Sequence, residues 1–372
     1  MRKAALRLVE LGAATQWRGP DPYDALFVRW PPLLINGRRR RQALIQLHAR
    51  SPVDFRRIYR RHHSLVPKAP ALLGQAAVRL WRANGDDRAR ALVEDAMETL
   101  ATDTTAGEKA WGYPWATQTR WSYYPAGSPN IIATAFSASA LAEAADALDR
   151  PEWRLRAEGA ATWVAQELYS PDRGYFAYHG QSNRLIHNAN LLGAALVYLL
   201  TPEEPATTAA VQAAIASTLD AQRTDGTWPY GEGDGLEWVD SFHTGYVLDA
   251  LRRLEPVDPR IPTALERGAD VYASEFFDDG RPQLWRNRRY PEDSHSAGTG
   301  LTVLTSLARL NLVAASTVKG LARYTMDRLT QANGHAVFRR GRFGGTRVRY
   351  LRWCDAPVAL GLSTAATICD SP

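Results

Sequence analysis

The feature that most constrains the fold is a repeat of about 54 residues along the second half of the chain. Short turns, each followed closely by an aromatic or apolar residue, place Gly174, Gly226, Gly280 and Gly334 at intervals of 52, 54 and 54 residues. Glycine, aspartate and asparagine favour such turns because they tolerate a positive φ. A period of this length predicts a chain built from copies of one supersecondary unit.

Each copy predicts two helices, one on either side of the turn. Apolar helices rich in small residues follow the turns, and an earlier copy precedes them: 128–148, 188–200, 241–254, 294–310 and 351–366. More charged helices come before most turns, as at 154–170 and 262–277. Small side chains let helices pack closely, so the apolar helices are expected on the inside and the charged helices on the outside.

The repeat predicts an all-α fold of the (α/α)6-toroid type, in which an outer ring of helices wraps an inner ring. Five units cover residues 85–366, so residues 85–372 are expected to form the toroid domain. Residues 1–84 are expected to form an N-terminal helical segment that completes the toroid with a sixth hairpin. The alternative is an open superhelix of helical pairs with a long concave face. We favour the closed ring because five or six hairpins close such a ring.

Composition excludes several classes of protein. The chain has 372 residues and 45% hydrophobic content, which is ample for a sizeable core. Its two cysteines, Cys354 and Cys369, make neither a disulfide framework nor a zinc-ribbon spacing, and they fit a reducing compartment. No segment is expected to reach the length of a membrane helix, and Arg7 and Glu10 interrupt the apolar run that a signal peptide needs. We therefore expect a cytoplasmic protein without a transmembrane segment.

Basic residues are concentrated in clusters, and the net charge is +6. The clusters lie at 37–42, 55–63, 286–289 and 339–349. Such clusters could meet nucleic acid, anionic lipid or an acidic glycan, or they could be a solvated arginine-rich surface. No signature of a nucleic-acid-binding module accompanies the charge, so we expect no nucleic-acid partner.

Polar residues recur just before and at the start of each inner helix. In a toroid these segments converge on one end, which we call the mouth: 123–134, 187–190, 240–244, 293–296 and 352–355. Asp240 and His243 lie three residues apart and share a helix face. A carboxylate beside an imidazole fixes the ring's orientation, which suits general acid–base catalysis. The predicted catalytic residues are Tyr124, His187, Asp240, His243 and His295.

These residues also have structural interpretations. Asp240 and Asp293 each stand just before a helix, where a short polar side chain caps free N–H groups, and the capping role is compatible with a catalytic one. Asn130, after Pro129, could simply start a helix, and His187 could be a core histidine with satisfied hydrogen bonds.

Aromatic residues supply flat faces on which sugar rings or cations can stack. Residues 111–124 hold six aromatics, and 228–238 hold three more. Some of these rings could instead fill the core. The predicted substrate-binding residues are Trp111, Trp115, Arg120, Asn130, Asn190, Trp228, Tyr230, Glu232, Trp238, Tyr246, Asp293, Arg352 and Trp353.

Motifs for metals and phosphate-containing cofactors are absent from the sequence. There is no His-Glu-x-x-His, no pair of Cys-x-x-Cys and no aspartate-rich calcium loop. A phosphate-cradling glycine-rich loop and a Gly-x-Ser-x-Gly elbow are also missing. We therefore expect neither a metal nor a cofactor.

Several motifs resemble, in order and over nearly the full length, a family of uncharacterised bacterial and archaeal proteins often found among polysaccharide biosynthesis genes. The motifs are DPYDAL (21–26), SPVDFR (51–56), WGYPW (111–115), PNIIATAF (129–136), HNANLL (187–192), DGTWPYG (225–231), WVDSFHTGYVLDAL (238–251), YPEDSHSA (290–297) and YLRW (350–353). That family is similar to the α/α toroids of terpenoid cyclases, prenyltransferases and six-hairpin glycosidases. The resemblance implies a toroid and a polysaccharide context, without an established reaction.

One motif resembles the terpenoid side of that group. QRTDGTW (222–228) fits the Gln-x-x-x-Gly-x-Trp core of the squalene-cyclase repeat. The Asp-x-Asp-Asp acid motif of those cyclases is missing from this chain, which counts against carbocation cyclisation.

Three functions follow from these observations. The first is a carbohydrate-active enzyme acting on an acidic or cell-surface glycan in polysaccharide biosynthesis or modification. Hydrolysis would use carboxylates such as Glu232 and Asp240, whereas uronate epimerisation or elimination would use a Tyr or His base with Arg120 or Arg352 neutralising the sugar carboxylate. The second is an isoprenoid cyclase or transferase, and the third is a non-catalytic glycan-binding scaffold. An open polar cleft favours a glycan, and a closed apolar pocket favours an isoprenoid. The sequence does not predict the oligomeric state.

Overall fold

The computed structural model describes residues 1–27, 32–51, 54, 63–201, 204–346 and 348–369. Most of the SPVDFR motif at 51–56, and most of the basic cluster at 55–63, lie outside the described residues.

Twelve of the described helices form two concentric rings. The inner ring is α4 (Lys68–Asn84), α6 (Ile131–Leu148), α8 (His187–Leu200), α10 (Ser241–Arg253), α12 (Ser294–Arg309) and α14 (Asp355–Cys369). The outer ring is α1 (Arg2–Ala13), α5 (Asp87–Ala101), α7 (Pro151–Glu167), α9 (Pro205–Leu219), α11 (Ile261–Phe276) and α13 (Ala315–Arg328). Outer and inner helices alternate along the chain, as the repeat predicts.

The inner ring is closed. Each inner helix contacts the next one, and α14 contacts α4, so the last inner helix meets the first. The outer helix α1 packs against both α14 and α4 and covers this junction. The predicted toroid is therefore confirmed, and the open superhelix is wrong. Residues 1–84 contribute α1 and α4 to the two rings, whereas a domain boundary at residue 84 stays a prediction.

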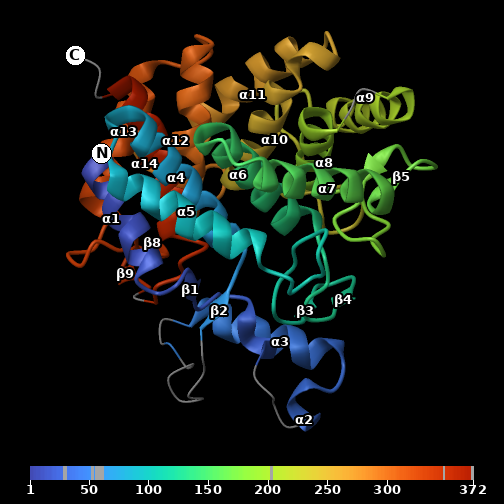
Figure 1. Ribbon diagram of the computed structural model, residues 1–372, viewed down its shortest axis with the longest axis horizontal. Helices are drawn as coiled ribbons and strands as arrows, with labels where there is room; N and C mark the ends of the chain where they lie inside the picture. Colours follow the sequence, from blue (N-terminus) through green and yellow to red (C-terminus); the bar gives the residue numbers. More distant parts are fainter. Residues whose placement is uncertain (28–31, 52–53, 55–62, 202–203, 347, 370–372) are drawn as a thin grey trace.

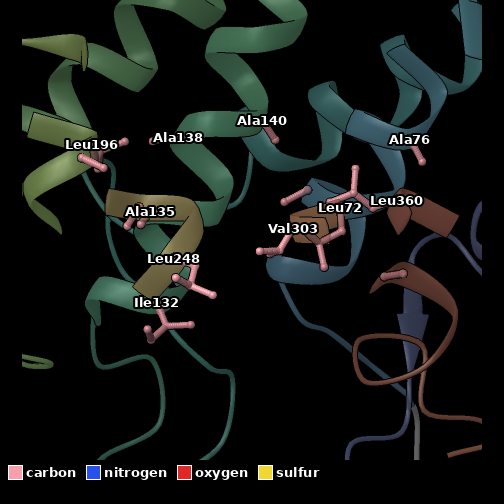
Figure 2. Packing of buried hydrophobic residues seen from close by; sticks show 14 of the residues in the cluster. Leu72, Ala76, Ile132, Ala135, Ala138, Ala140, Leu196, Leu248, Val303 and Leu360 are labelled. Carbon is pink, nitrogen blue, oxygen red and sulfur yellow. The ribbon is translucent and has the colours of Figure 1, made fainter. Parts of the chain in front are cut away.

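Small residues allow the inner helices to approach one another closely. At the crossing of α12 and α14, a Cβ atom added to Gly298 would lie 2.2 Å from the carbonyl carbon of Pro357. Leu72 of α4, Val303 of α12 and Leu360 of α14 lie close together beside this crossing (Figure 2). The core thus combines alanine- and glycine-rich helix contacts with larger aliphatic side chains.

The helix α6 is strongly apolar, with a mean hydropathy of 1.4. By length and hydropathy it passes the test for a membrane span, contrary to the expectation from the sequence, and 67% of it is buried inside the protein. It lies between α4 and α8 and is covered by α5 and α7. Its apolar character is therefore explained by its position in the inner ring.

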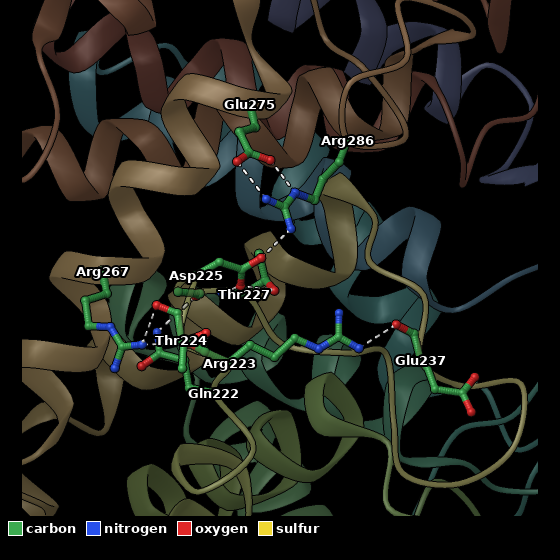
Figure 3. Close-up of polar contacts among 10 residues, drawn as sticks. Gln222, Arg223, Thr224, Asp225, Thr227, Glu237, Arg267, Glu275 and Arg286 are labelled. Carbon is green, nitrogen blue, oxygen red and sulfur yellow. Dashed lines mark hydrogen bonds and ion pairs between the residues drawn. The ribbon is translucent and has the colours of Figure 1, made fainter.

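The repeat turn acts as a structural clamp between helices. In the 222–228 turn, the Gln222 side chain donates hydrogen bonds to the carbonyls of Gly226 at 3.0 Å and Ala264 at 2.9 Å. Arg286 binds Asp225 at 2.7 Å and also pairs with Glu275 of α11 (Figure 3). The Gln-x-x-x-Gly-x-Trp motif therefore has a structural role here, tying the turn after α9 to α11.

Short elements link the loops at one end of the ring. The two-stranded sheets pair β1 (Arg18–Gly19) with β2 (Ser64–Leu65), β3 (Thr117–Gln118) with β4 (Tyr123–Tyr124), and β5 (Tyr169–Ser170) with β6 (Tyr175–Phe176). The strands β7 (Glu292–Asp293), β8 (Arg339–Gly341) and β9 (Gly344–Gly345) form a three-stranded sheet. Because β7 precedes α12 and β8 precedes α14, this sheet ties two mouth loops together.

The remaining short helices lie in the loops. They are η1 (Asp24–Phe27), α2 (Pro32–Ile35), α3 (Arg38–Arg50), η3 (Glu255–Val257) and η4 (Asp278–Gly280). The helix α3 contacts β3, and both lie with β4 on one side of the helical rings (Figure 1). Isolated backbone bridges join further neighbouring loops, at Ile186–Gly231 and Asp240–Trp285. The mouth is thus a continuous collar of connected loops.

Candidate active site

A histidine–carboxylate pair occupies the start of α10. The Asp240 carboxylate caps the helix by accepting the backbone N–H of His243 at 2.9 Å, and it also lies 2.8 Å from His243 Nδ1. Asp240 is buried, with 3% exposure, whereas the His243 side chain is 21% exposed. One carboxylate therefore performs both the capping and the orienting roles that the sequence suggests.

The hydrogen-bond directions fix the tautomer of His243. A carboxylate only accepts, so Nδ1 carries the hydrogen that points to Asp240, and Nε2 of the neutral ring keeps its lone pair. Within the described part of the chain, no residue hydrogen-bonds this Nε2. The Tyr230 ring contacts the imidazole edge-on at 4.6 Å between centroids, and the Phe242 ring lies at 4.2 Å. His243 thus presents a proton acceptor in an aromatic setting.

A second polar chain lies beside the first. His295, near the start of α12, places Nδ1 3.2 Å from the carbonyl oxygen of Trp353 and Nε2 2.7 Å from the Tyr246 hydroxyl. That hydroxyl is also 2.7 Å from Nζ of Lys68. Burial, followed by the neighbouring charges of Lys68 and Arg352, lowers the pKa of His295 well below its usual value. Burial likewise lowers the pKa of Lys68 and raises the pKa of Tyr246.

Arg352 is held in place by residues from the two ends of the chain. Its guanidinium makes a two-point contact with Asp21, at 2.6 and 2.9 Å. It also lies 5.0 Å from the Tyr113 ring centroid and 4.8 Å from that of Trp353. Both partners are buried, so the charge of Arg352 is already compensated by Asp21. This arrangement weakens the prediction that Arg352 neutralises a substrate carboxylate.

Asp293 occupies the position in α12 that Asp240 has in α10. It caps the helix by accepting the N–H of Ser296 at 2.9 Å, and its other oxygen accepts from Arg339 at 2.8 Å. Its partner is therefore an arginine from β8, so Asp293 braces two mouth loops.

A cavity of about 140 Å³ lies beside Tyr230, whose ring contacts His243. Aromatic rings and polar side chains alternate around it: Tyr113, Trp115, Trp121, Tyr124, Asn130, Tyr178, His179, Arg184 and Tyr230 are among the residues that line it. The rings of Tyr113 and Trp115 are stacked, with an interplanar angle of 8°. Tyr230 belongs to the cavity wall and also touches His243, so it joins the cavity to the imidazole. We call this space the aromatic cavity.

Not every predicted residue reaches this region. Trp111 and Trp228 are buried in the core, where their indole N–H groups donate to the carbonyls of Leu100 and Thr218. Asn190 is fully buried and bonds the Phe176 N–H and the Ala214 carbonyl. These side chains bind structural partners rather than line the mouth.

His187 is also buried in the core. Its side chain is fully buried, Nδ1 lies 3.2 Å from the Thr218 hydroxyl, and burial lowers its pKa to about 4. Glu232 lies 3.6 Å from Nε2, a distance at which a protonated ring would form an ion pair. Burial outweighs this single carboxylate because Glu232 is 56% exposed and well solvated, so the ring is neutral.

The predicted residues that the structure brings together lie around the two histidines and the aromatic cavity. Asp240 and His243 form one hydrogen-bonded pair, Tyr246, His295 and Trp353 form a second hydrogen-bonded chain, and Trp115, Tyr124, Asn130 and Tyr230 line the cavity. Trp238 stacks on Tyr230 with centroids 4.2 Å apart, while Arg120 and Glu232 lie on the exposed rim.

Sequence reasoning missed four residues of this region: Asp21, Lys68, Tyr113 and Tyr178. Asp21 lies in the DPYDAL motif, which signalled that the segment matters without revealing its partner. Lys68 stands at the start of an inner helix, as the other candidate residues do. The predicted repeat units begin at residue 85, so they do not include it.

No group of three or more His, Cys, Asp or Glu side chains suitable for a metal ion is found among the described residues. The expectation of neither metal nor cofactor stays a prediction.

No family model matches the chain. A curated relative, ent-copalyl diphosphate synthase of Streptomyces sp. (strain KO-3988), is 29% identical over 133 residues, which is 36% of this chain. The match spans about a quarter (24%) of that relative's length.

Solved structures are similar over most of the chain. Cellobiose 2-epimerase from Bacillus thermoamylovorans B4167 has a TM-score of 0.61 at 12% identity, covering 82% of this chain and 90% of that one. An unsaturated glucuronyl hydrolase specific for heparin has a TM-score of 0.64 at 12% identity, covering 100% and 98%. The unsaturated glucuronyl hydrolase from Bacillus sp. GL1 has a TM-score of 0.61 at 12% identity, covering 83% and 89%. The fold is a six-hairpin α/α toroid. At these identities the likeness shows the fold alone, and it confirms the predicted resemblance to glycosidase-type toroids.

Proposed function

We propose that this protein is a carbohydrate-active enzyme that moves a proton at a sugar carbon, as an epimerase or lyase, on an acidic or cell-surface glycan. The observation that carries the proposal is the Asp240–His243 pair, in which a buried carboxylate orients a partly exposed imidazole toward the mouth. A positioned His with a free nitrogen is the commonest general acid–base group in enzymes.

The aromatic cavity supports a sugar as the ligand. Sugar rings stack on flat aromatic faces, and the stacked Tyr113 and Trp115 rings form part of this wall. Hydroxyl groups of Thr117, Ser122 and Ser182 lie between the rings and suit sugar hydroxyls as hydrogen-bond partners. The cavity therefore combines the two kinds of contact that carbohydrate sites need.

The state of the carboxylates favours proton transfer over hydrolysis. A glycosidase of the usual kind needs one carboxylic acid and one carboxylate on either side of the scissile bond. In the described mouth, Asp21 is bound to Arg352, Asp240 to His243 and Asp293 to Arg339. Each of these three carboxylates is thus committed to a partner, whereas the imidazole of His243 keeps a free nitrogen.

Arg184 is the cation that we propose for an acidic sugar. Its guanidinium lines the aromatic cavity and lies 5.2 Å from the Trp121 ring centroid. Unlike Arg352, it forms no ion pair within 4.0 Å with a carboxylate of the described residues. An Arg in this position can take a uronate carboxylate in a two-point contact.

The fold neighbours agree with this class of reaction. They include cellobiose 2-epimerase and unsaturated glucuronyl hydrolases, so toroids of this shape do hold carbohydrate-active sites. We also propose that the protein works in a reducing, cytoplasmic environment, since its two cysteines make no disulfide framework.

The similarity to ent-copalyl diphosphate synthase favours an isoprenoid cyclase as the second candidate. Two observations count against it. Asp240, the acid that a cyclase would need, is engaged by His243 and by the helix N-terminus. The Gln222–Trp228 motif shared with the cyclase repeat forms the structural clamp at the outer ring.

A substrate screen tests the proposal. Wild type would be incubated with cellobiose, an unsaturated heparin disaccharide, oligoglucuronate and geranylgeranyl diphosphate, with products read by NMR. We expect conversion of a sugar by wild type and its loss in His243→Ala. His335→Gln is the control, because His335 forms a similar pair with Asp355 at 2.6 Å on a turn that packs against α1. Sugar binding without conversion by wild type would support the scaffold function instead, and conversion of the diphosphate alone would establish the cyclase.

A further inference from the structure

Lys68 is unusual among the basic residues of this chain. The sequence has only four lysines among its 45 basic residues, and Lys3, Lys109 and Lys319 are exposed. Lys68 is 3% exposed, at the start of the inner helix α4. Arginine is the usual choice for buried charge because it cannot be deprotonated, whereas a buried lysine can titrate. A chain that uses arginine nearly everywhere thus places an amine at this one buried position.

The contacts of Lys68 differ from those of the nearby arginines. Its Nζ lies 2.7 Å from the Tyr246 hydroxyl and 4.1 Å from the Phe136 ring centroid. No carboxylate of the described residues lies within 4.0 Å of it, whereas Arg352 and Arg339 each bind an aspartate. Lys68 therefore donates a hydrogen bond to a phenol hydroxyl and does not neutralise a buried carboxylate.

Hydrogen bonds link the Trp353 carbonyl, His295, Tyr246 and Lys68 in series. Their directions follow from the Trp353 carbonyl. The Trp353 carbonyl only accepts, so Nδ1 of His295 carries the hydrogen, and Nε2 of the neutral ring is an acceptor. Tyr246 must then donate its hydroxyl hydrogen to Nε2. The Tyr246 oxygen in turn accepts from Nζ of Lys68 at 2.7 Å and, at the longer distance of 3.5 Å, from the Thr299 hydroxyl.

Among the hydrogen-bonded residues Lys68, Tyr246 and His295, Tyr246 is the one that lines a cavity. It is half-buried and lines the cavity on the ring axis together with Phe136 and Thr299, whereas His295 is 1% exposed. It lies three residues after His243, so both side chains leave the same face of α10 one turn apart. The Phe242 ring contacts both, with its centroid 4.2 Å from that of His243 and 6.3 Å from that of Tyr246, so the two polar groups flank one aromatic side chain.

We propose that Tyr246 is the second proton-transfer group of the site, and that Lys68 and His295 are positioning residues that set the direction in which its proton moves. This inference rests on the proposed function and assigns the partner that His243 needs to invert a carbon. In one direction the sugar C–H bond breaks and its proton joins the Tyr246 oxygen, while the Tyr246 proton passes to Nε2 of His295. His243 starts this direction as the imidazolium, so its Nε2 proton then forms the new C–H bond on the opposite face and leaves the neutral ring. The reverse reaction runs the same transfers backward.

Charged and titratable groups surround this chain on every side. Asp21 and Arg352 face Lys68, His243 faces His295, and Asp240 and Tyr113 face Tyr246. Arg352 is held by Asp21 in a two-point contact, and Lys68 and His295 are the two basic groups of the chain whose pKa values burial lowers.

The first test needs no substrate. Histidine ¹⁵N NMR would follow the protonation of His295 in wild type, Lys68→Met, Lys68→Arg and the control Lys319→Met. Because Lys68 contributes to the low pKa of His295, Lys68→Met is expected to raise that pKa. Lys68→Arg keeps a charge and is expected to leave it low, and Lys319→Met is expected to have no effect. An unchanged His295 titration in folded Lys68→Met would overturn the assignment.

The second test separates the two proton transfers with the sugar that wild type converts. Tyr246→Phe is expected to lower kcat by about 100-fold or more, with KM changed little, since a proton-transfer group is lost and the ring is kept. Lys68→Arg is expected to lower kcat and alter its pH profile, because a guanidinium cannot titrate as an amine does. Full kcat and an unchanged pH profile in Lys68→Arg would contradict the inference. If His243→Ala is inactive and Tyr246→Phe is fully active, the proposed function stands and this inference fails.

Discussion

At the scale of single residues, one short acidic side chain serves different purposes at equivalent positions. Asp240 and Asp293 both cap an inner helix, but Asp240 orients an imidazole and Asp293 binds the guanidinium of Arg339. The capping role follows from position alone. The second partner depends on what the next loop supplies, so only the structure distinguishes a candidate catalytic aspartate from a bracing one.

Asp240→Asn should separate capping from chemistry. Asparagine caps helices about as well as aspartate, so the free energy of unfolding should change by less than about 1 kcal/mol. The amide nitrogen favours the tautomer with hydrogen on Nε2, so kcat should fall by about 10²- to 10⁴-fold. Urea unfolding and turnover of the same samples would check both. The control is Asp86→Asn, which changes the cap of the outer helix α5, and equal turnover losses in the two variants would refute the role of Asp240.

His187 predicts a dependence of stability on pH. Its pKa is about 4 in the folded protein and about 6.5 when unfolded, so the neutral ring stabilises the fold above pH 6.5. That stability is lost as the pH falls from the unfolded value toward the folded one. The contribution lost between about pH 7 and about pH 5 is roughly 2 kcal/mol. Urea unfolding of wild type and His187→Gln at both values would measure it, and an equal pH dependence in the two proteins would disprove the assignment.

Residue types and spacing located the Asp240–His243 pair, because i and i+3 on a helix are neighbours whatever the fold does. They did not reveal that Trp111, Trp228 and Asn190 face the core, since a loop side chain turns inward or outward according to its tertiary neighbours. The Asp21–Arg352 contact joins residues 331 positions apart, and no local pattern encodes such a pairing.

At the scale of elements, the inner helices are defined by how closely they approach. The periodic apolar pattern predicted 241–254 and 294–310 almost as observed, Ser241–Arg253 and Ser294–Arg309. It placed the start of the last inner helix at 351, whereas α14 starts at Asp355. Residues 351–354 form a turn that contains Arg352 and Trp353. Two residues of the candidate site therefore lie in a turn where the apolar pattern predicts helix.

Two glycines make a matched test of this packing. Gly298→Ala places a Cβ against the Pro357 backbone at the α12–α14 crossing and should destabilise the fold by about 3 kcal/mol. Gly159 lies within α7 and has nothing within 4 Å of its would-be Cβ, so Gly159→Ala should stabilise by about 0.5–1 kcal/mol. Thermal and urea unfolding would give both values. Destabilisation of similar size in both variants would show that the close crossing is not the cause.

At the scale of the whole molecule, the closed ring distinguishes this protein from a linear repeat array. The repeat period and the small-residue helices predicted the toroid, because each copy must bury its apolar helix against the next. Closure depends on contacts of α14 with α4 and α1, between the two ends of the chain, and the repeat could suggest this pairing without specifying it.

Hydrogen exchange should report the closure. In an open array the terminal units fray, so their amides exchange first. In the closed ring, amides of α4 and α14 should be protected as well as those of α8 and α10, because each of these helices has inner neighbours on both sides. Mass spectrometry of exchanged peptides would measure this. Rapid exchange confined to α4 and α14 would contradict the closed ring.

The central claim is that the mouth of this ring moves a proton at a sugar carbon through His243. The most direct measurement is solvent deuterium incorporation, with cellobiose, oligoglucuronate and the unsaturated heparin disaccharide each incubated in D₂O and followed by NMR. The account predicts deuterium at one ring carbon of one of these sugars with wild type, and none with His243→Ala. Hydrolysis of a sugar by wild type with no deuterium on carbon, or the same incorporation in His243→Ala, would contradict it.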